Sequence, residues 1–145
     1  MRAVIQVVSQ ASVTVLGELI SEIKNGYLIL LAISVNDTED KISKMAEKII
    51  NLRIFPDENE KINLNIKDVK GEILLVSQFT LYGDVKKGNR PSFIESARPE
   101  QANLYYDKIA VKLRAADLTV KTGSFGAHMN VALINNGPCT IIIDI

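Results

Sequence analysis

The chain has 145 residues, of which 47% are hydrophobic and 23% are charged, and its 17 Lys and Arg residues balance 17 Asp and Glu residues. This length predicts a single domain over residues 1–145, and the composition is that of a globular protein with a sizeable core. Zero net charge excludes wholesale electrostatic binding to a long duplex, so no DNA partner is expected. A single RNA end can still bind at a local patch.

No segment indicates export, a membrane span or a metal centre. Residues 1–6 lack the features of a secretion signal, and no apolar stretch reaches the ~20 residues that a membrane span requires. One histidine, His128, and one cysteine, Cys139, do not supply a zinc site or a disulfide framework. A lone cysteine fits a reducing compartment. We therefore expect a cytoplasmic protein that uses no cofactor, no metal and no membrane.

The first half of the chain predicts four strands and a helix. Val and Ile alternate with polar residues over residues 2–9 and 11–16, which indicates two strands, and further strands are expected over 18–23 and 27–33. We interpret this opening as an antiparallel meander. Apolar residues at helical spacing then predict a helix over residues 39–50.

The residues around this helix are also informative. The run Asp37-Thr38-Glu39-Asp40 supplies an N-cap for this helix and acidic residues in its first turn, because short polar side chains there can accept from the first helical N–H groups. A short strand is expected over residues 53–56, and the polar stretch 57–70 is predicted to be irregular.

The second half predicts one buried strand, one helix and a final strand pair. Residues 72–76 form a continuous apolar strand, and residues 83–97 form a long basic loop. Pro99 opens a helix that extends to about residue 116. Strands at 129–134 and 140–145 bracket what looks like a hairpin turn. Hairpins alternating with two main helices predict an α+β fold with a curved, mostly antiparallel, barrel-like sheet.

The junction after residues 72–76 is the first candidate site. Ser77, Gln78 and Thr80 place two hydroxyls and an amide at the end of a rigid strand, which suits recognition of a small polar group. The same residues also cap strands and satisfy loop backbone groups in many proteins. A Ser or Thr nucleophile needs a base, and nothing in the sequence pairs His128 with this segment, so a Ser-His-Asp triad is a weak hypothesis.

Three other motifs have both a structural and a functional interpretation. Phe125 lies between glycines and is either a core residue or the aromatic wall of a pocket. Gly137-Pro138 is either a plain turn or a cis bond that turns two carbonyls to one side. The long loop is either a solvated tip or a phosphate clamp formed by its basic residues, Lys86, Lys87 and Arg90.

Six segments share their order and spacing with one known family: Met1–Gln6, Ala11–Val15, Ser77–Leu81, Lys87–Phe93, Thr122–Met129 and Asn135–Thr140. Together they resemble the D-aminoacyl-tRNA deacylases over essentially the whole chain. The resemblance implies a homodimer with two active sites at the subunit interface. It implies hydrolysis of the ester between a D-amino acid and the 3′-terminal adenosine of tRNA, with mischarged glycyl-tRNA as a further substrate.

The resemblance also assigns roles to particular residues. Phe79 and Thr80 are implied as catalytic, through backbone N–H groups and a hydroxyl that assists by hydrogen bonding or, less favoured, attacks the ester. Gly137 and Pro138 are implied to form a cis gate in the partner's site. Their carbonyls would accept from the substrate ammonium and crowd the side where an L side chain projects. The substrate-binding residues are implied to be Ser77, Gln78, Phe125 and Met129.

The chain departs from the family pattern beside this gate. Val7 replaces an arginine that usually braces the gate, Asn136 replaces an aspartate, and Cys139 replaces an apolar residue. We interpret Cys139 as a small buried hydrophobe. Three alternatives stay open: a dimer that binds adenosine or an RNA end without hydrolysis, an unrelated hydrolase that uses His128, and a purely structural dimer.

Overall fold

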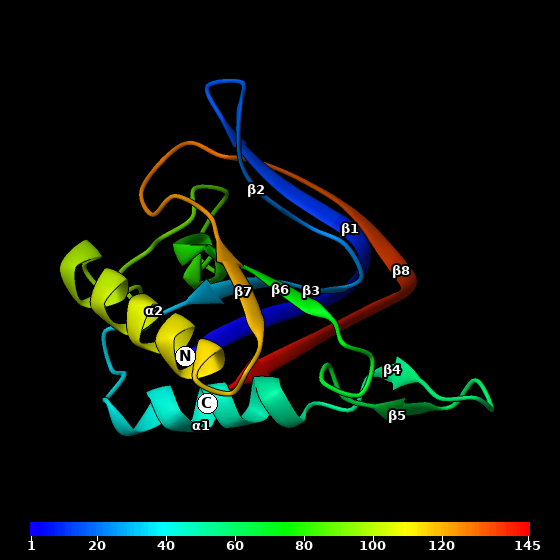
Figure 1. The fold of residues 1–145 in the computed structure, drawn as a ribbon. Helices are drawn as coiled ribbons and strands as arrows, with labels where there is room; N and C mark the ends of the chain where they lie inside the picture. Colours follow the sequence, from blue (N-terminus) through cyan, green and yellow to red (C-terminus); the bar gives the residue numbers. More distant parts are fainter.

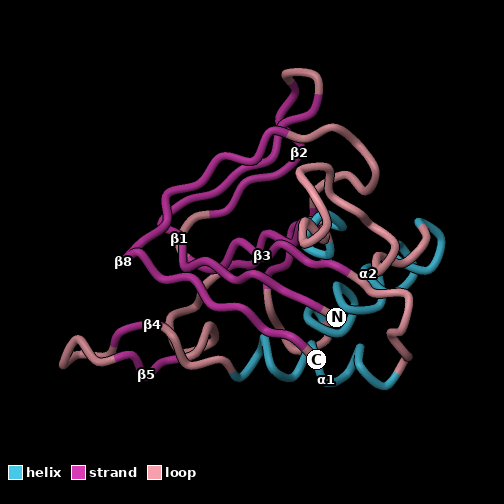
Figure 2. The backbone as a smooth tube through the Cα atoms, turned by 180° about the vertical axis from the view of Figure 1, so that it is seen from behind, coloured by secondary structure: helices cyan, strands magenta, loops and turns pink.

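In the computed structural model of residues 1–145, two helices pack against a strongly curved sheet of six strands (Figure 1). The sheet follows the order β2-β1-β3-β6-β7, and β8 pairs with β1. The strands are β1 (Arg2–Val15), β2 (Glu18–Ile23), β3 (Gly26–Ala32), β6 (Glu72–Ser77), β7 (Thr119–Thr122) and β8 (Asn130–Asp144). Figure 2, which is turned by 180°, shows β1 and β8 running side by side through the bend of the sheet. The predicted α+β class is confirmed.

One continuous strand, β1, organises the sheet. It pairs antiparallel with β3 through its first half, with β2 through its second half, and with β8 along most of its length. The predicted break near Ser9 and Gln10 is wrong, because the chain stays extended there and both residues are merely exposed. The predicted meander is also wrong, since β1 lies between β2 and β3 in the sheet.

The remaining pairings make the sheet mixed rather than mostly antiparallel. Strands β3 and β6 are parallel, and so are β6 and β7, which the sequence did not predict as a strand. Parallel strands are usually covered on both faces, and Ile73–Val76 are accordingly buried. Gly26 permits the close approach of β3 to β6, because a Cβ there would lie 1.8 Å from the Glu72 carbonyl oxygen.

The two predicted helices are confirmed as α1 (Asp40–Asn51) and α2 (Pro99–Arg114), which begins at Pro99 as expected. They contact each other and bury their apolar faces in the main core. A short 3₁₀ helix, η1 (Phe79–Tyr82), follows β6. The stretch predicted to be irregular instead contains β5 (Ile62–Leu64), which pairs with β4 (Phe55–Pro56). No helix is long and apolar enough to cross a membrane.

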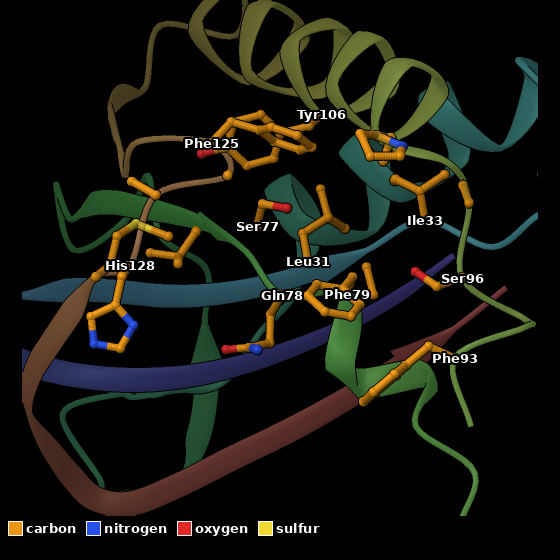
Figure 3. Close-up of a pocket in the computed structure, with 18 of the residues that line it drawn as sticks. Leu31, Ile33, Ser77, Gln78, Phe79, Phe93, Ser96, Tyr106, Phe125 and His128 are labelled. Atoms are coloured by element: carbon orange, nitrogen blue, oxygen red, sulfur yellow. The ribbon is translucent and has the colours of Figure 1, made fainter. Parts of the chain in front are cut away.

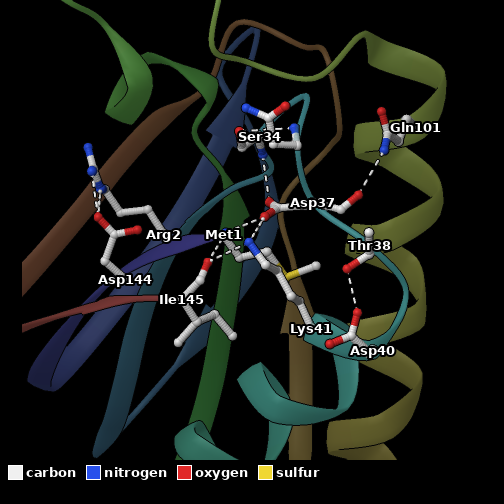
Figure 4. A network of polar contacts seen from close by, with 11 residues as sticks. Met1, Arg2, Ser34, Asp37, Thr38, Asp40, Lys41, Gln101, Asp144 and Ile145 are labelled. Carbon is white, nitrogen blue, oxygen red and sulfur yellow. Dashed lines mark hydrogen bonds and ion pairs between the residues drawn. The ribbon is translucent and has the colours of Figure 1, made fainter.

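Asp37 does not cap α1, whose N-cap residue is Glu39. Its carboxylate is instead buried in a polar cluster (Figure 4). The Met1 α-amino group donates to Oδ1 at 2.6 Å, Lys41 Nζ donates to the same oxygen at 2.9 Å, and Ser34 N donates to Oδ2 at 2.7 Å. Asp37 has this role because it contacts Met1, which is far away in the chain, and a local cap pattern carries no information about such a contact.

The final strand pair is a single long strand. Residues 130–144 form β8, which follows β1 from Asn130 opposite Thr14 to Asp144 opposite Arg2. The predicted hairpin turn is therefore wrong. One residue separates Gln6 from Val8 on β1, whereas four residues separate their partners Thr140 and Asn135 on β8. The Gly-Pro segment is thus a bulge within one strand, where an Asn-Gly-Pro sequence imitates a turn signal.

Candidate active site

A cavity of about 540 Å³ lies where β3 and β6 end (Figure 3). Strands β3 and β6 are parallel, and Leu31 is opposite Ser77 in their register. The side chains at the ends of both strands therefore lie at the same edge of the sheet. The first residue of η1, the end of the loop before α2, the first half of α2, residues 125–129 and Val131 complete the wall. Ligands in sheets with parallel strands commonly bind at such carboxyl ends.

Three of the four predicted residues at this junction line the cavity: Ser77, Gln78 and Phe79. Thr80 does not line it and is exposed beside it. Its Oγ1 accepts a hydrogen bond from the Gln78 side-chain amide, so the two predicted residues are held together. The backbone N–H of Gln78 donates to the Leu31 carbonyl at 2.8 Å, which fixes the start of the segment against β3.

The next two backbone N–H groups, those of Phe79 and Thr80, donate to no group of the chain. The first N–H groups of any helix lack an intrahelical acceptor, and here they lie beside the cavity. The segment η1 is held from its other side by Arg2, whose Nη1 donates to the Leu81 carbonyl at 2.9 Å. Arg2 is in turn paired with Asp144 at 2.5 Å and lies 5.0 Å from the centre of the Tyr82 ring.

Aromatic rings form much of the cavity wall. Phe79 and Phe93 meet edge to face, with centroids 5.1 Å apart. Phe125 packs at 6.0 Å from Tyr106, whose hydroxyl donates to the Leu75 carbonyl at 2.6 Å. Burial raises the pKa of Tyr106, so the ring stays neutral as a structural wall. Phe125 and Met129 both line the cavity, as predicted.

Two glycines lie against the side chains of this wall. A Cβ on Gly83 would lie 3.0 Å from both the Phe93 ring and the Thr80 carbonyl oxygen, so a larger residue there would be tightly packed against the backbone. A Cβ on Gly123 would lie 2.8 Å from the Met129 sulfur, which belongs to the flexible end of a side chain and can shift. Close packing is therefore stricter at Gly83 than at Gly123.

The cavity contains no Asp, Glu, Lys or Arg in its lining. His128 lies at one end of it, and the structure gives its ring no hydrogen-bond partner. A Ser-His-Asp triad needs a carboxylate to orient the imidazole, and no carboxylate lines the cavity, so the lining does not support that hypothesis. No group of His, Cys, Asp and Glu residues that could hold a metal ion is found either.

The Gly137–Pro138 bond is cis, as the resemblance implied. Both residues are exposed, and neither lines the cavity of its own chain. The bulge is braced from within β8, because Asn135 Oδ1 accepts from Cys139 N at 3.2 Å and Asn135 Nδ2 donates to Thr140 Oγ1 at 3.0 Å. Val7, opposite the bulge, is buried in the core, so its side chain is not available to contact the exposed Gly137 and Pro138.

The other residues singled out in the sequence lie outside the cavity, either beside the Gly-Pro bulge or in the basic loop. Cys139 is partly buried against the core, as expected, and Asn136 is exposed. The three basic residues, Lys86, Lys87 and Arg90, are exposed and do not line the cavity. Their loop borders the site, because Phe93 near its end does line the cavity.

Sequence reasoning missed several lining residues. Leu31 and Ile33 come from the end of β3, and their place follows only from its parallel pairing with β6. Tyr106 was recognised as a helix residue but not as part of a site. Ser96 carries no signal in the sequence, yet its Oγ is buried without a hydrogen-bond partner.

Comparison with known proteins gives consistent matches over the whole chain. The family described as D-Tyr-tRNA(Tyr) deacylase matches residues 4–144. A protein named D-aminoacyl-tRNA deacylase from Thermosipho africanus is 52% identical, over 99% of this chain and 97% of its own length. One of the same name from Chloroflexus aurantiacus is 56% identical, over 99% of this chain and 90% of its own length.

Solved structures agree with this fold. A structure named c-Myc DNA Unwinding Element Binding Protein is 45% identical with a TM-score of 0.93, and the match covers 99% of this chain and 98% of that one. A structure described as a probable eukaryotic D-amino acid tRNA deacylase has a TM-score of 0.85, with the same coverage, at 18% identity. At that identity the second likeness concerns the fold alone.

Proposed function

The chain belongs to the D-Tyr-tRNA(Tyr) deacylase family, and from this premise we propose that it hydrolyses the ester between a D-amino acid and the 3′-terminal adenosine of tRNA. The observation that carries the proposal is the cavity at the end of β6, which has hydrogen-bonding groups but no charged base in its lining. An aminoacyl ester is already activated, and its ribose carries a neighbouring hydroxyl. Such a substrate needs alignment and charge stabilisation more than a strong base.

The chemical step follows from this arrangement. A water oxygen attacks the ester carbonyl carbon, the bond from that carbon to the ribose oxygen breaks, and the ribose oxygen leaves with a proton. The products are free tRNA and a D-amino acid. The unpaired N–H groups of Phe79 and Thr80 are suited to bind the negative oxygen that develops. One well-placed donor of this kind contributes about 10²–10³ in rate.

Thr80 is proposed to assist through its hydroxyl, which the Gln78 amide holds in place. A Thr80→Val variant keeps the backbone N–H groups and the shape of the side chain, so it isolates the hydroxyl. We expect its kcat to fall at least about tenfold at unchanged thermal stability, in line with the loss of one hydrogen bond made in the transition state. Unchanged turnover would remove the hydroxyl from the mechanism, and a trapped acyl-Thr80 species would make it the nucleophile.

The chiral gate is proposed to act between two copies of the chain. Gly137 and Pro138 are exposed on β8, outside their own cavity, which supports a role in a partner's site. The same strand exposes Ile134 and Ile142, and an apolar strand at a sheet edge is a surface that a second copy can cover. Carbonyls of the gate would accept from the substrate ammonium and crowd the position of an L side chain.

This gate predicts a broad substrate range. A D side chain points away from the crowded side, so the enzyme is expected to discriminate little among D-amino acids. Glycine has no side chain to clash, and glycyl-tRNA is therefore an expected substrate. We propose that the basic residues Lys86, Lys87 and Arg90 contact tRNA phosphates; the position of their loop at the border of the cavity supports this. A tRNA substrate and a free Cys139 support the cytoplasm as the place of action.

The deciding experiment compares D-Tyr-tRNA with L-Tyr-tRNA. Release of D-tyrosine with the L-ester left intact is the expected result. Binding of either tRNA without release of amino acid would favour an RNA-end-binding dimer instead.

A His128→Ala variant is expected to keep activity, because the ring has no partner that would orient it as a base. Loss of turnover in that variant would favour the unrelated hydrolase that uses His128. No feature of this uncharged cavity favours the DNA binding that one relative's name describes.

A further inference from the structure

Ser96 has a rigidly placed backbone. Its N–H donates to the Phe93 carbonyl at 3.0 Å, and the next residue, Ala97, donates to the Ile33 carbonyl at 2.9 Å. On the residue before it, the Glu95 carbonyl accepts from Val35 N at 3.1 Å. The serine therefore lies in a short segment that is tied on both sides to the chain that follows β3, and its side chain has little freedom to move away.

The hydroxyl of this serine has no hydrogen-bond partner although it is inaccessible from outside. It is the single buried side-chain polar atom of the chain in this condition. Ser96 lines the cavity, and Figure 3 shows its oxygen directed inward, at the end opposite His128. An unpaired buried hydroxyl is unfavourable, because it loses its hydrogen bonds to water without gaining others, so an ordinary core position would favour alanine. A polar ligand in the cavity would supply the missing partner.

We propose that Ser96 Oγ is a substrate-binding group that forms a hydrogen bond with a polar atom of the 3′-terminal aminoacyl-adenosine. This inference rests on the proposed function. Three groups of that substrate are the candidate partners: the 6-amino group of the base, the 2′-hydroxyl of the ribose and the amino group of the amino acid. A serine hydroxyl both donates and accepts, so its chemistry suits each of them, and the experiment below separates the three.

The first test measures kinetics and stability together on Ser96→Ala. We expect KM for D-Tyr-tRNA to rise about 5- to 20-fold, with kcat within about twofold, because one neutral hydrogen bond to bound substrate is lost. Thermal stability should be unchanged or higher, since the variant removes an unpaired polar group. Ser43→Ala is the matched control, because this serine lies on α1 outside the cavity.

The second test identifies the partner atom by binding. Non-hydrolysable 3′-amide analogues of D-aminoacyl-adenosine are compared by calorimetry on the wild-type protein and Ser96→Ala. One analogue lacks the 6-amino group of the base, one lacks the ribose 2′-hydroxyl, and one replaces the amino group of the amino acid with hydrogen. The penalty of the substitution should vanish for the analogue that lacks the partner atom.

The outcomes separate this inference from the function on which it rests. Wild-type protein that does not release D-tyrosine overturns the proposed function itself. Active wild-type protein with an unchanged KM in Ser96→Ala overturns only the role of Ser96. A clear fall in thermal stability, or a binding penalty that persists with all three analogues, also overturns it, because each indicates a structural hydroxyl.

Discussion

Two polar regions of this molecule differ in how many of their polar groups have hydrogen-bond partners. Around Asp37 each carboxylate oxygen has a donor, and the Ile145 carbonyl accepts from both the Met1 α-amino group and Lys41 (Figure 4). At the cavity, by contrast, the Ser96 hydroxyl has no partner (Figure 3), and neither do the backbone N–H groups of Phe79 and Thr80 beside it. Both regions hold polar groups that are shielded from solvent, but only around Asp37 do all of these groups have hydrogen-bond partners.

The difference separates polar groups that hold the fold from polar groups that await a ligand. Buried charges persist only when they are paired and hydrogen-bonded, so the Asp37 cluster must be complete in the folded chain. An incomplete set carries a cost in the free protein, and we expect it to gain its partners when substrate binds. Substitutions in the first region should therefore change stability, whereas substitutions in the second should change binding or turnover.

The largest expected effect comes from Asp37→Asn. This change keeps the shape of the side chain but leaves the buried Met1 ammonium without a counter-charge. Breaking a buried pair by removing one partner commonly costs about 3–5 kcal/mol, and we expect a loss of that size in urea unfolding. Asp107→Asn, at an exposed position on α2, is the control. A loss under 1 kcal/mol would contradict the structural role given to the cluster.

The same carboxylate predicts an acid-sensitive stability. Burial would raise the pKa of Asp37, but hydrogen bonds from the Met1 amino group, Ser34 and Lys41 lower it below 3.8. The folded pKa is thus below the unfolded value, so the contribution is present above about pH 4 and is lost as pH falls through the folded pKa. Unfolding measured from pH 6 to pH 2 should show this loss, and Asp37→Asn should flatten it.

The comparison also explains what could be predicted from the sequence. Periodicity located both helices and the buried strand Ile73–Val76, because burial of one face leaves a repeating pattern. The Asn-Gly-Pro signal at residues 136–138 was misinterpreted, because a bulge and a hairpin turn use the same residue types. Pairing across the sheet decides between them, and that information is not local.

The candidate site was predicted unevenly for the same reason. Ser77, Gln78 and Phe125 belong to contiguous motifs and were identified, whereas Ile33 and Tyr106 reach the cavity only through the packing of β3 and α2. Asp37 has the residue type of a helix cap and the location of one, so only its contact with the other end of the chain reveals its different role.

A smaller effect, on turnover, is expected from Arg2→Met. Arg2 Nη1 holds the Leu81 carbonyl, and Leu81 lies one residue after Thr80 in η1. We therefore expect Arg2 to act as a positioning residue that helps to orient the two unpaired N–H groups of η1. We expect kcat to fall about tenfold with little change in KM, since misplaced groups lose alignment in the transition state. Arg2→Lys should restore part of the loss, and equal losses in kcat and thermal stability would instead indicate a role in the fold.

The smallest effect is expected where an ion pair is exposed. Lys44 and Asp40 are paired at 2.8 Å with side chains 65% and 59% exposed, and hydrogen bonds from Lys44 and Thr38 lower the pKa of Asp40 to about 2. Solvent screens such pairs, and their two long side chains lose freedom on pairing, so the pKa shift does not translate into stability. Lys44→Gln should leave the thermal midpoint unchanged within error at both low and high salt. A clear destabilisation would show that an ion pair stabilises this fold even when it is exposed, which would contradict the distinction drawn between the buried Asp37 cluster and exposed pairs.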